Sequence, residues 1–333
     1  MHCSHISIPF TLICSIDDFT ARALGCDFMV HYGHSCLVPV DVTDIKCLYV
    51  FVEISIDLDH FVRVVQTNFE PTQALVIVST VQFISSAHSA KAILMDLHGF
   101  QNITIPQSKP LSSGEILGCT APTLKPSDAC DAFLYLGDGR FHLEAMMIAN
   151  PNIPAYRYDP YDQVLSQEYY DMEKMLDLRH SAIKCSRNAK RFGIILGTLG
   201  RQGNLSVLDN LIQLIRQHVP DATVHKLLMS EIFPQKLELM DDLVDVWIQI
   251  ACPRLSIDWG HFFRKPLLNP YEAAQLFVTA PEGLSSYPMD FYATDSSGNW
   301  TPNHPDNAAV KKAAPAKAIK FSEWKSRMKD KKK

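Results

Sequence analysis

The sequence lacks any long apolar run. Its apolar stretches fall well short of the ~20 residues that a membrane-spanning helix requires. Residues 1–14 carry no Lys or Arg before their short apolar core, and no small-residue cleavage pattern follows it. These absences argue against a membrane partner and against a secretory signal peptide, so we expect a cytoplasmic protein.

Neither sign of charge is in large excess. The formal net charge is −5 and the pI is about 6.2, so the electrostatics of the whole chain do not indicate direct binding to nucleic acid. Apolar residues make up 47% of the 333 residues, which is enough for substantial hydrophobic cores. At ~100–200 residues per domain, this length predicts two or three domains.

The nine cysteines lack the local spacings that usually mark a metal site. No Cys-x-x-Cys pair and no Cys-x3-Cys-x2-Cys motif occurs, and the number of cysteines is odd. An odd count in a long chain argues against a disulfide framework. Most of the cysteines are therefore expected to be small buried residues, and any bound metal must take its ligands from distant parts of the chain.

Short apolar runs alternate with helical patterns. Residues 204–219 show the clearest helical periodicity, with a capping residue at Asn204 or Ser206. Strands that alternate with helices predict an α/β fold with parallel sheets. The runs that we interpret as buried strands are 27–33, 47–54, 74–80, 132–138, 192–198, 223–229 and 244–252.

Two glycine-rich loops follow predicted strands. The loop "GTLGRQG" places Gly197, Gly200 and Gly203 between a strand and a helix, where backbone N–H groups can hold a carboxylate or phosphate. It is neither a Walker loop nor a G-x-G-x-x-G motif, and a tight strand-to-helix turn is an equally good interpretation. The second loop, "LGDGRFHLEA", gathers several polar residues just after a strand, although a lone His142 is more often structural than a ligand.

Three cysteines differ from the others in their settings. Cys119 and Cys252 lie in turn-like stretches beside Gly or Pro, and Cys14 follows an apolar run and precedes an acidic pair. Three thiolates are what an iron–sulfur cluster with one open iron requires. The cysteines whose patterns instead favour packing roles are Cys26, Cys47, Cys130 and Cys185.

Several long motifs carry a resemblance to a known family. Five stretches closely resemble the catalytic iron–sulfur subunit 1 of the eukaryotic 2-(3-amino-3-carboxypropyl)histidine synthases. They are "LGDGRFHLEAMMIANPNIPAYRYDPY", "GIILGTLGRQGN", "EILGCTAP", "CPRLSIDWG" and "PLLNPYEA". The resemblance covers 13–301, which is nearly everything outside the two ends. It implies three similar α/β units around a pseudo-threefold centre, each giving one cysteine to a [4Fe–4S] cluster. The cysteines at the matching positions are Cys14, Cys119 and Cys252.

The resemblance also implies a reaction and partners. Members of this family transfer the 3-amino-3-carboxypropyl group of S-adenosylmethionine to C2 of a histidine imidazole in translation elongation factor 2, the first step of diphthamide biosynthesis. The reduced cluster supplies one electron, and methylthioadenosine is the other product. The implied partners are a paralogous second subunit in a heterodimer, an electron-donor protein of the pathway and the elongation factor itself.

The residues that would hold S-adenosylmethionine are inferred from chemistry and not from the family. Backbone groups of the two glycine-rich loops suit its carboxylate, with Arg140 or Arg201 as the charge partner. No catalytic side chain beyond the cluster ligands is predicted. The residues expected to contact this molecule are Gly137, Asp138, Gly139, Arg140, Gly197, Gly200, Arg201 and Gly203.

The expected domains are a first α/β unit at 1–62, a second at 63–175, a third at 176–292 and a disordered Lys-rich tail at 293–333. The first unit departs from the family, because "FTLIC" stands where "YGAC" is usual and a longer preceding segment is expected. We therefore expect an N-terminally truncated chain with an incomplete first unit.

Two alternatives stand beside the catalytic interpretation. A non-catalytic α/β scaffold that supports a catalytic paralogue is the stronger one, although such a subunit is expected to lose one or more ligand cysteines. A zinc-dependent hydrolase is a poor alternative, because no cluster of His and Asp ligands occurs.

Overall fold

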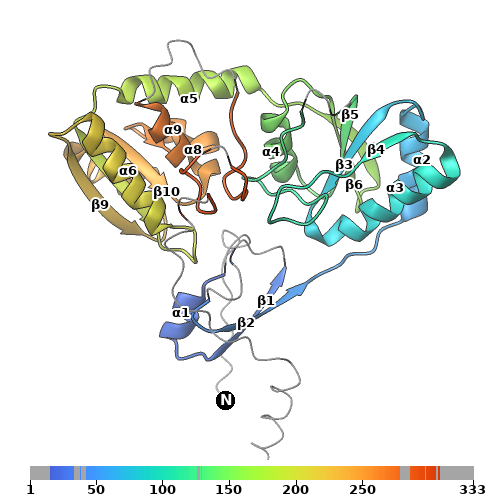
Figure 1. The fold of residues 1–333 in the computed structure, drawn as a ribbon, viewed down its shortest axis with the longest axis horizontal. Helices are drawn as coiled ribbons and strands as arrows, with labels where there is room; N and C mark the ends of the chain where they lie inside the picture. Colours follow the sequence, from blue (N-terminus) through green and yellow to red (C-terminus); the bar gives the residue numbers. More distant parts are fainter. Residues whose placement is uncertain are drawn as a thin grey trace, which may run out of the picture.

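Three separate sheets organise the protein (Figure 1). The computed structural model describes residues 16–33, 38, 43–125, 128, 130–277, 286–296, 298–304 and 307. Within these residues the sheets have two, five and four strands, in that order along the chain. We call the groups of elements around them the first, second and third units.

The first unit holds α1 (Asp18–Ala23), β1 (Phe28–Gly33) and β2 (Lys46–Phe51). Asp17 caps α1, because its side chain accepts a hydrogen bond from the Thr20 N–H. The two strands pair in parallel, with Phe28 opposite Lys46. Much of this sheet is solvent-exposed. The large apolar residues exposed on its strands are Phe28, Val30, Tyr32, Leu48 and Phe51.

The second unit is built on a sheet with the strand order β4-β3-β5-β6-β7. All of its pairings are parallel except that of β6 with β7. Helices α2 and α3 bury apolar residues against one face of β3 and β5, and α4 packs against the other face. The elements are α2 (Leu58–Asn68), β3 (Ala74–Ser79), η2 (Val81–Phe83), α3 (Ile84–His98), β4 (Asn102–Thr104), β5 (Ala132–Leu136), α4 (Phe141–Ala149), β6 (Ala155–Asp159) and β7 (Val164–Glu168).

The third unit has the strand order β11-β10-β8-β9, with all pairings parallel. Helix α6 covers one face with Leu208, Leu211 and Ile215, and Trp247 lies in the core of the other face. The elements are β8 (Arg191–Gly197), α6 (Leu205–His218), β9 (Thr223–Met229), α7 (Pro234–Glu238), η3 (Asp241–Leu243), β10 (Val246–Ile250), α8 (Pro253–Trp259), η4 (Gly260–Phe262), β11 (Leu267–Leu268) and α9 (Pro270–Gln275).

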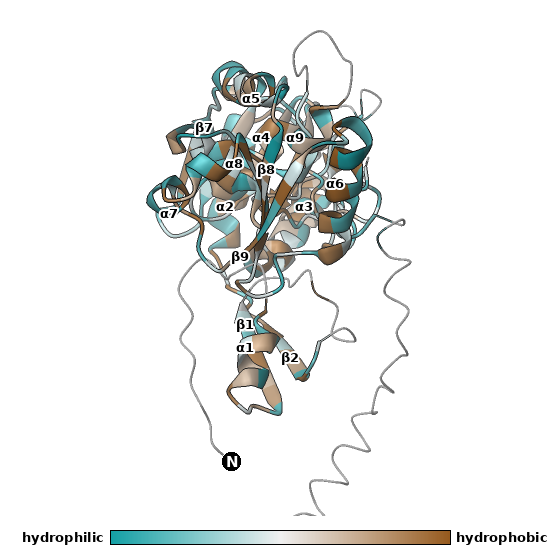
Figure 2. Ribbon diagram, turned by 90° about the vertical axis from the view of Figure 1, so that its left-hand side faces the viewer, coloured by the Kyte–Doolittle hydropathy of each residue, from teal (hydrophilic) through white to brown (hydrophobic). Residues whose placement is uncertain are grey.

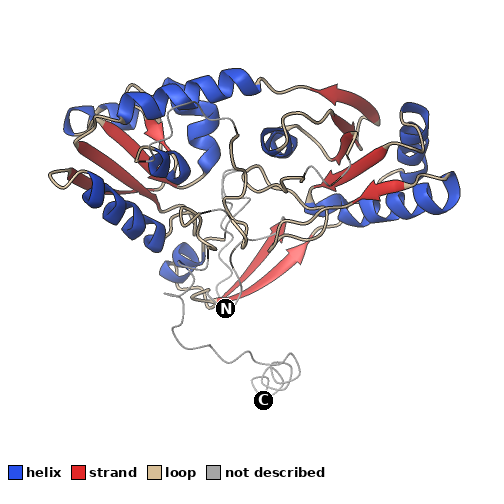
Figure 3. Cartoon of the chain, turned by 45° about the horizontal axis from the view of Figure 1, so that its top comes forward, coloured by secondary structure: helices blue, strands red, loops and turns tan. Residues whose placement is uncertain are grey.

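Helix α5 (Met172–Ser186) connects the second unit to the third and runs along the top of the molecule in Figures 1 and 3. Its buried Arg179 anchors it to the third unit. Arg179 donates to both carboxylate oxygens of Glu272 on α9, at 2.5 and 2.7 Å. Glu272 also completes a capping box with Asn269, so one carboxylate serves both the start of α9 and the docking of α5.

A C-terminal segment at 286–296 returns from the third unit to the second. We call it the strap. Tyr287, Met289 and Phe291 of the strap are buried in the core that also holds β5 and α4. Beyond the strap, Asn307 is 1% exposed and accepts a hydrogen bond from Asn210 on α6. The described residues from 293 to 307 thus pack on the protein, which corrects the expectation that a disordered tail begins at 293.

The expected α/β class with parallel sheets is confirmed. All seven predicted strands form, but β1, β2 and β9 are largely exposed or half-buried, so the expectation that all seven are buried was wrong. The helix predicted at 204–219 is α6, with Asn204 as its capping residue. In the described part of the chain, no helix has the length and apolar character needed to span a membrane. The other domain boundaries and the pseudo-threefold relation between the units stay predictions.

Candidate functional site

Cys252 lies at a sharp transition from strand to helix. Strand β10 ends at Ile250, Cys252 is the residue before α8, and Pro253 occupies the first turn of that helix. Proline fits there because the first helical N–H groups need no partner within the helix. The strand therefore stops before the cysteine, two residues earlier than the predicted strand at 244–252, and Pro253 begins the next helix.

A buried glutamine shapes the backbone around Cys252. Gln249 is fully buried, and its side chain donates to the Cys252 carbonyl at 2.9 Å and accepts from the Ala251 N–H at 2.9 Å. These bonds fix the turn that carries the thiol. Burial raises the pKa of Cys252, although Arg254 opposes this effect. The Cys252 sulfur therefore keeps its proton until a metal cation binds and displaces it.

Cys119 lies in a tight turn between Leu117 and Thr120. The N–H of each of these two residues donates to the carbonyl of the other, at 2.9 and 3.2 Å. The strap covers this turn, because Phe291 donates its N–H to the Cys119 carbonyl at 3.3 Å. Cys119 is 6% exposed. The backbone around it is thus held both locally and by a segment far away in the sequence.

Gly118 leaves space in this turn for the ring of Phe141. A Cβ atom built there would lie 2.1 Å from Cε1 of Phe141. The ring of Phe141 in turn supports the guanidinium of Arg254, which lies 4.4 Å from the ring centroid. The absence of a side chain at Gly118 therefore makes room for the ring that supports Arg254.

Arg254 links the two cysteine loops. It lies two residues after Cys252, it is 3% exposed, and its Nη1 donates to the carbonyl of Gly118 at 3.3 Å and to that of Phe141 at 2.9 Å. Its charge is balanced by ion pairs to Glu144 of α4 at 2.5 Å and Asp258 of α8 at 2.9 Å. Burial alone would lower the pKa of Arg254, but these carboxylates raise it, so the side chain stays charged.

The structure thus brings the Cys119 loop and the Cys252 loop together from different units. Cys14, the third predicted ligand, lies outside the described residues. Within those residues no group of three His, Cys, Asp or Glu side chains is placed to hold a metal ion. Two thiols on adjoining loops match two of the three thiolates that an iron–sulfur cluster with one open iron requires.

The loop "GTLGRQG" closes on itself. Gly203 donates its N–H to the Gly197 carbonyl at 3.1 Å, and a Cβ at Gly203 would lie 2.4 Å from that carbonyl oxygen. Gly200 has a φ of +58°, in the left-handed region that favours glycine. Arg201 donates from Nε and Nη2 to the two oxygens of Asp18 in the first unit, both at 2.7 Å. Whether this loop contacts S-adenosylmethionine stays a prediction.

The loop at 137–140 is more open. Gly137 is buried, and Asp138, Gly139 and Arg140 are exposed. Arg140 pairs with Glu144 at 3.0 Å and with Glu168 at 3.3 Å. It also lines an open cleft of about 550 Å³, to which α4, α5 and α8 contribute. The guanidinium also donates to the Tyr169 carbonyl at 2.6 Å, so Arg140 lines the cleft with most of its donors already bound.

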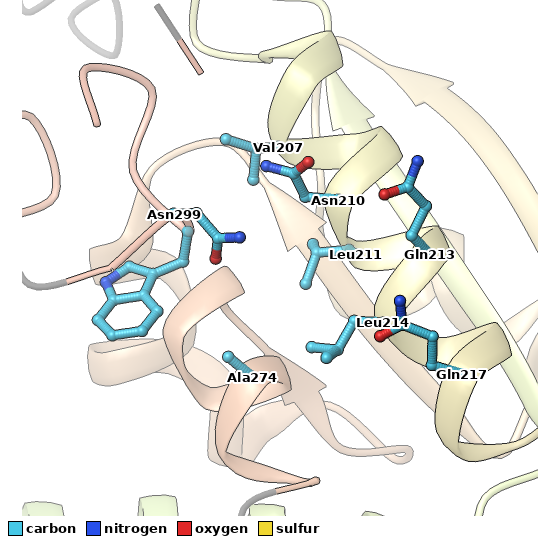
Figure 4. A pocket seen from close by; sticks show the side chains of 9 residues that line it. Val207, Asn210, Leu211, Gln213, Leu214, Gln217, Ala274 and Asn299 are labelled. Carbon is cyan, nitrogen blue, oxygen red and sulfur yellow. The ribbon is translucent and has the colours of Figure 1, made fainter. Parts of the chain in front are cut away.

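A second, smaller pocket of about 160 Å³ lies where the residues after the strap meet α6 and α9 (Figure 4). Amide side chains and leucines line it, including Asn210, Gln213, Leu214 and Asn299. It contains no charged group and none of the residues predicted to contact S-adenosylmethionine. We therefore do not assign it to that molecule.

The remaining described cysteines confirm the packing interpretation only in part. Cys130 donates to the Ala132 carbonyl at 3.4 Å, and burial raises its pKa to about 11, as for a structural thiol. Cys26 and Cys47 are half-buried. Cys185 is exposed on α5, so the expectation that it packs in the interior was wrong. Cys3 and Cys36 lie outside the described residues.

Sequence reasoning missed three residues that shape the site. Arg254, Gln249 and Phe141 all lie within or beside the quoted motifs, but their roles depend on contacts between units. The arginine next to the Cys-Pro pair was the available signal. Its partners are far away in the sequence, since Gly118 is 136 residues earlier.

Comparisons with known proteins identify the family of this chain. The family described as "Putative diphthamide synthesis protein" matches residues 13–288. The "2-(3-amino-3-carboxypropyl)histidine synthase subunit 1" of Schizosaccharomyces pombe is 56% identical over 88% of this chain and 67% of its own length. The proteins of the same name from Nematostella vectensis and Homo sapiens are 55% and 54% identical, over 61% and 65% of their lengths. The chain thus spans about two thirds or less of these relatives.

Solved structures show the same fold. The crystal structure of Dph2 from Pyrococcus horikoshii with a 4Fe-4S cluster matches 87% of this chain and 80% of its own, with a TM-score of 0.66 and 23% identity. A second structure of that protein matches with a TM-score of 0.64 and 24% identity. With a family match over most of its length and relatives more than half identical, this chain belongs to the diphthamide synthesis protein family.

Proposed function

We propose that this chain is the cluster-bearing subunit of a 2-(3-amino-3-carboxypropyl)histidine synthase. It moves the 3-amino-3-carboxypropyl group of S-adenosylmethionine to C2 of a histidine imidazole in translation elongation factor 2. The names of its relatives support this reaction. The single structural observation behind it is the Arg254 contact with Gly118, which brings the loops of Cys119 and Cys252 together.

The described residues fit a [4Fe–4S] cluster as far as they extend. Cys119 and Cys252 would provide two thiolate ligands, and Cys14 would provide the third. When bound, the cluster supplies the electron that opens the sulfonium. The solved structure of Dph2 with a 4Fe-4S cluster supports this assignment at the level of the fold.

The reaction balances without a further reactant. The bond between sulfur and the aminocarboxypropyl carbon breaks, and methylthioadenosine leaves. A carbon–carbon bond would form at C2 of the imidazole, C2 would lose its hydrogen as a proton, and the electron that opened the sulfonium would be given back, so that no net electron is consumed. The protein's part is to place the two substrates and to exclude water.

This chain's own residues hold the two cysteine loops in place. Gln249 fixes the turn at Cys252, the strap fixes the turn at Cys119, and Arg254 holds the two turns together. Arg140 lines the open cleft, where it can pair with the carboxylate of S-adenosylmethionine. The glycine loop at 197–203 would contribute backbone groups to the same molecule.

The proposed partners are a paralogous second subunit, an electron-donor protein and the elongation factor. The cytoplasm is the proposed location. A scaffold role beside a catalytic paralogue is the rival function. Iron bound through this chain's cysteines supports the synthase, because a scaffold has no need of those thiols.

The first test measures iron and sulfide per chain in anaerobically purified heterodimer. We expect Cys14→Ala, Cys119→Ala and Cys252→Ala each to lose most of the cluster, and Cys185→Ala to retain it, because Cys185 is exposed on α5. Cys130→Ala is a second control, because that thiol bonds within its own unit. Full iron retention in the Cys119 and Cys252 variants would favour the scaffold.

The second test identifies the small-molecule product. Reduced heterodimer with S-adenosylmethionine and elongation factor should yield methylthioadenosine, separated by chromatography. Formation of 5′-deoxyadenosine and methionine as the main products would contradict the proposed cleavage.

A further inference from the structure

A buried hydroxyl group lies beside the sulfur of Cys119. Thr120 follows Cys119 in the tight turn and is fully buried. Its hydroxyl donates a hydrogen bond to Cys119 Sγ, with 3.8 Å between the oxygen and the sulfur. The bond is long because sulfur is a large atom and a neutral thiol is a weak acceptor. Within the described residues, this sulfur is the one acceptor that the Thr120 hydroxyl reaches.

The strap fixes the orientation of this hydroxyl. The N–H of Tyr292 donates to Thr120 Oγ1 at 3.2 Å, and so takes one of the acceptor positions of the hydroxyl oxygen. The backbone N–H and carbonyl of Thr120 are both bonded to Leu117 across the turn. The hydroxyl proton is therefore directed at the sulfur. The two successive bonds, from the Tyr292 N–H to the hydroxyl and from the hydroxyl to Cys119, polarise each other.

The bond to Cys119 gains strength when this cysteine binds iron. A cysteine must lose its proton to bind a metal, and hydrogen bonds to ionised groups are shorter and roughly twice as strong as those between neutral groups. Because Thr120 is 0% exposed, water does not compete for its proton. Hydrogen bonds to the sulfur ligands are one of the means by which a protein sets the reduction potential of an iron–sulfur cluster.

The two described cysteine loops differ in this respect. The neighbours of Cys252 in the chain are Ala251 and Pro253, and neither has a side chain that can donate a hydrogen bond. A hydroxyl donor next to the cysteine is thus a feature of the Cys119 loop. A single substitution at Thr120 removes it without touching either cysteine.

We propose that Thr120 is a positioning residue that donates a hydrogen bond to the Cys119 sulfur and thereby raises the reduction potential of the bound cluster. Reduction adds one negative charge to the cluster and its sulfur ligands, so the donor stabilises the reduced form more than the oxidised form. The cluster then accepts its electron more readily from the electron-donor protein. The inference rests on the proposed function, because it takes Cys119 as a cluster ligand.

The test compares Thr120→Val and Thr120→Ser with the unmodified chain in anaerobically purified heterodimer. Valine keeps nearly the shape of threonine without the hydroxyl, and serine keeps the hydroxyl without the methyl group. Thr120→Ala forms a second pair with Thr120→Ser, because these two differ only in the hydroxyl. Thr301→Val is the matched control, since the buried hydroxyl of Thr301 bonds to Ser296 and Gly298.

The readouts are iron per chain and the midpoint potential of the cluster, from a redox titration followed by electron paramagnetic resonance. We expect Thr120→Val and Thr120→Ala to keep their iron and to shift the reduction equilibrium at least threefold toward the oxidised cluster. This shift lowers the midpoint by about 28 mV, at 59 mV per tenfold change for one electron. Thr120→Ser and Thr301→Val should keep the potential of the unmodified chain.

Each other outcome overturns the inference in a recognisable way. A shift below threefold in both Thr120→Val and Thr120→Ala would show that the hydroxyl does not set the potential. Equal shifts in Thr120→Val and Thr120→Ser would assign the effect to packing. Loss of iron from both hydroxyl-free variants, but not from Thr120→Ser, would make the hydroxyl a requirement for cluster assembly instead. Full iron retention in Cys119→Ala would refute Cys119 as a ligand, and with it the proposed function, whatever the Thr120 variants show.

Discussion

At the scale of single residues, Arg254 has the largest structural role in the site. Its guanidinium reaches the carbonyls of Gly118 and of Phe141, the first residue of α4, and two carboxylates on different helices. The buried charge thus depends on both units being in place.

Arg254→Ala should lower the free energy of unfolding by about 3 kcal/mol, because it removes a buried guanidinium and leaves the partly buried Asp258 without its cation. It should also reduce iron per chain, because the two cysteine loops lose their link. Arg254→Lys should be intermediate, since one ammonium cannot make all four contacts. Urea unfolding and iron analysis measure the two effects. The exposed Arg22, replaced by Ala, serves as the control, and equal stability of Arg254→Ala and that control would contradict the assignment.

Tyr271 predicts a response to alkaline pH. Burial raises its pKa to about 12, with help from Glu272 and Asp290. A raised folded pKa gives stability that is fully present below the unfolded value near 10 and is lost as pH rises toward 12. Tyr271→Phe removes this loss, so its stability relative to the unmodified chain should improve by about 1 kcal/mol between pH 8 and pH 11. Urea midpoints at the two pH values measure it; an equal decline in both proteins would contradict it.

At the scale of elements, the strap shows that the conformation of the Cys119 loop depends on a segment far away in the sequence. Its backbone bonds to both sides of the loop, with Ala121 donating its N–H to the Met289 carbonyl at 2.8 Å. Its side chains complete the core around α4. The strap is thus part of the second unit's core, although it follows the third unit in the chain.

Phe291→Ala should lower the free energy of unfolding by about 3–5 kcal/mol, the usual cost of removing a buried aromatic ring. Phe291 is 4% exposed. Phe262→Ala is the matched control, because that ring is 58% exposed and should cost little. Chemical unfolding distinguishes the two, and similar midpoints would show that the strap contributes little to the core.

Local patterns predicted most elements, but not their long-range contacts. Helix α6 and the central strands β3, β5, β8 and β10 could be predicted because burial on one or both faces produces clear apolar patterns. The antiparallel strand β7 is half-exposed and has no such pattern. The strap has no regular periodicity either, since it is held by backbone bonds to the Cys119 loop, and its composition favours a tail.

At the scale of the whole molecule, the three sheets differ in how well they are covered. The sheet of β1 and β2 has two strands and exposes large apolar residues (Figure 2). Two-stranded sheets have little independent stability. The larger sheets have cores on both faces.

This difference predicts an order of hydrogen exchange. Amides of β1 and β2 should exchange at least tenfold faster than those of β8 and β10, because local opening there breaks fewer buried contacts. Exchange followed by mass spectrometry of peptides measures this in the isolated chain. Equal protection of the three sheets would mean that the first unit is stabilised by more than its described contacts.

The sequence predicted which cysteines form the site, but not the contacts that join their loops. The turns at Cys119 and Cys252 could be predicted, because Gly and Pro beside a residue indicate a turn. The pairing of Arg254 with Gly118 and of Arg201 with Asp18 could not be read, because each joins residues more than 130 positions apart. Such contacts depend on how whole units pack, so local sequence patterns do not predict them.

During protein synthesis, the Cys119 loop is made well before the strap that covers it. Tyr292 of the strap bonds to Thr120, which is 172 residues earlier in the chain. At about 5–20 residues per second, a ribosome makes the loop about ten to thirty seconds before it makes the cover. During that interval the Cys119 turn lacks the strap, and its thiol is open to iron donors and oxidants alike. A segment that is made after all three sheets therefore closes the loop of a cysteine that is made much earlier.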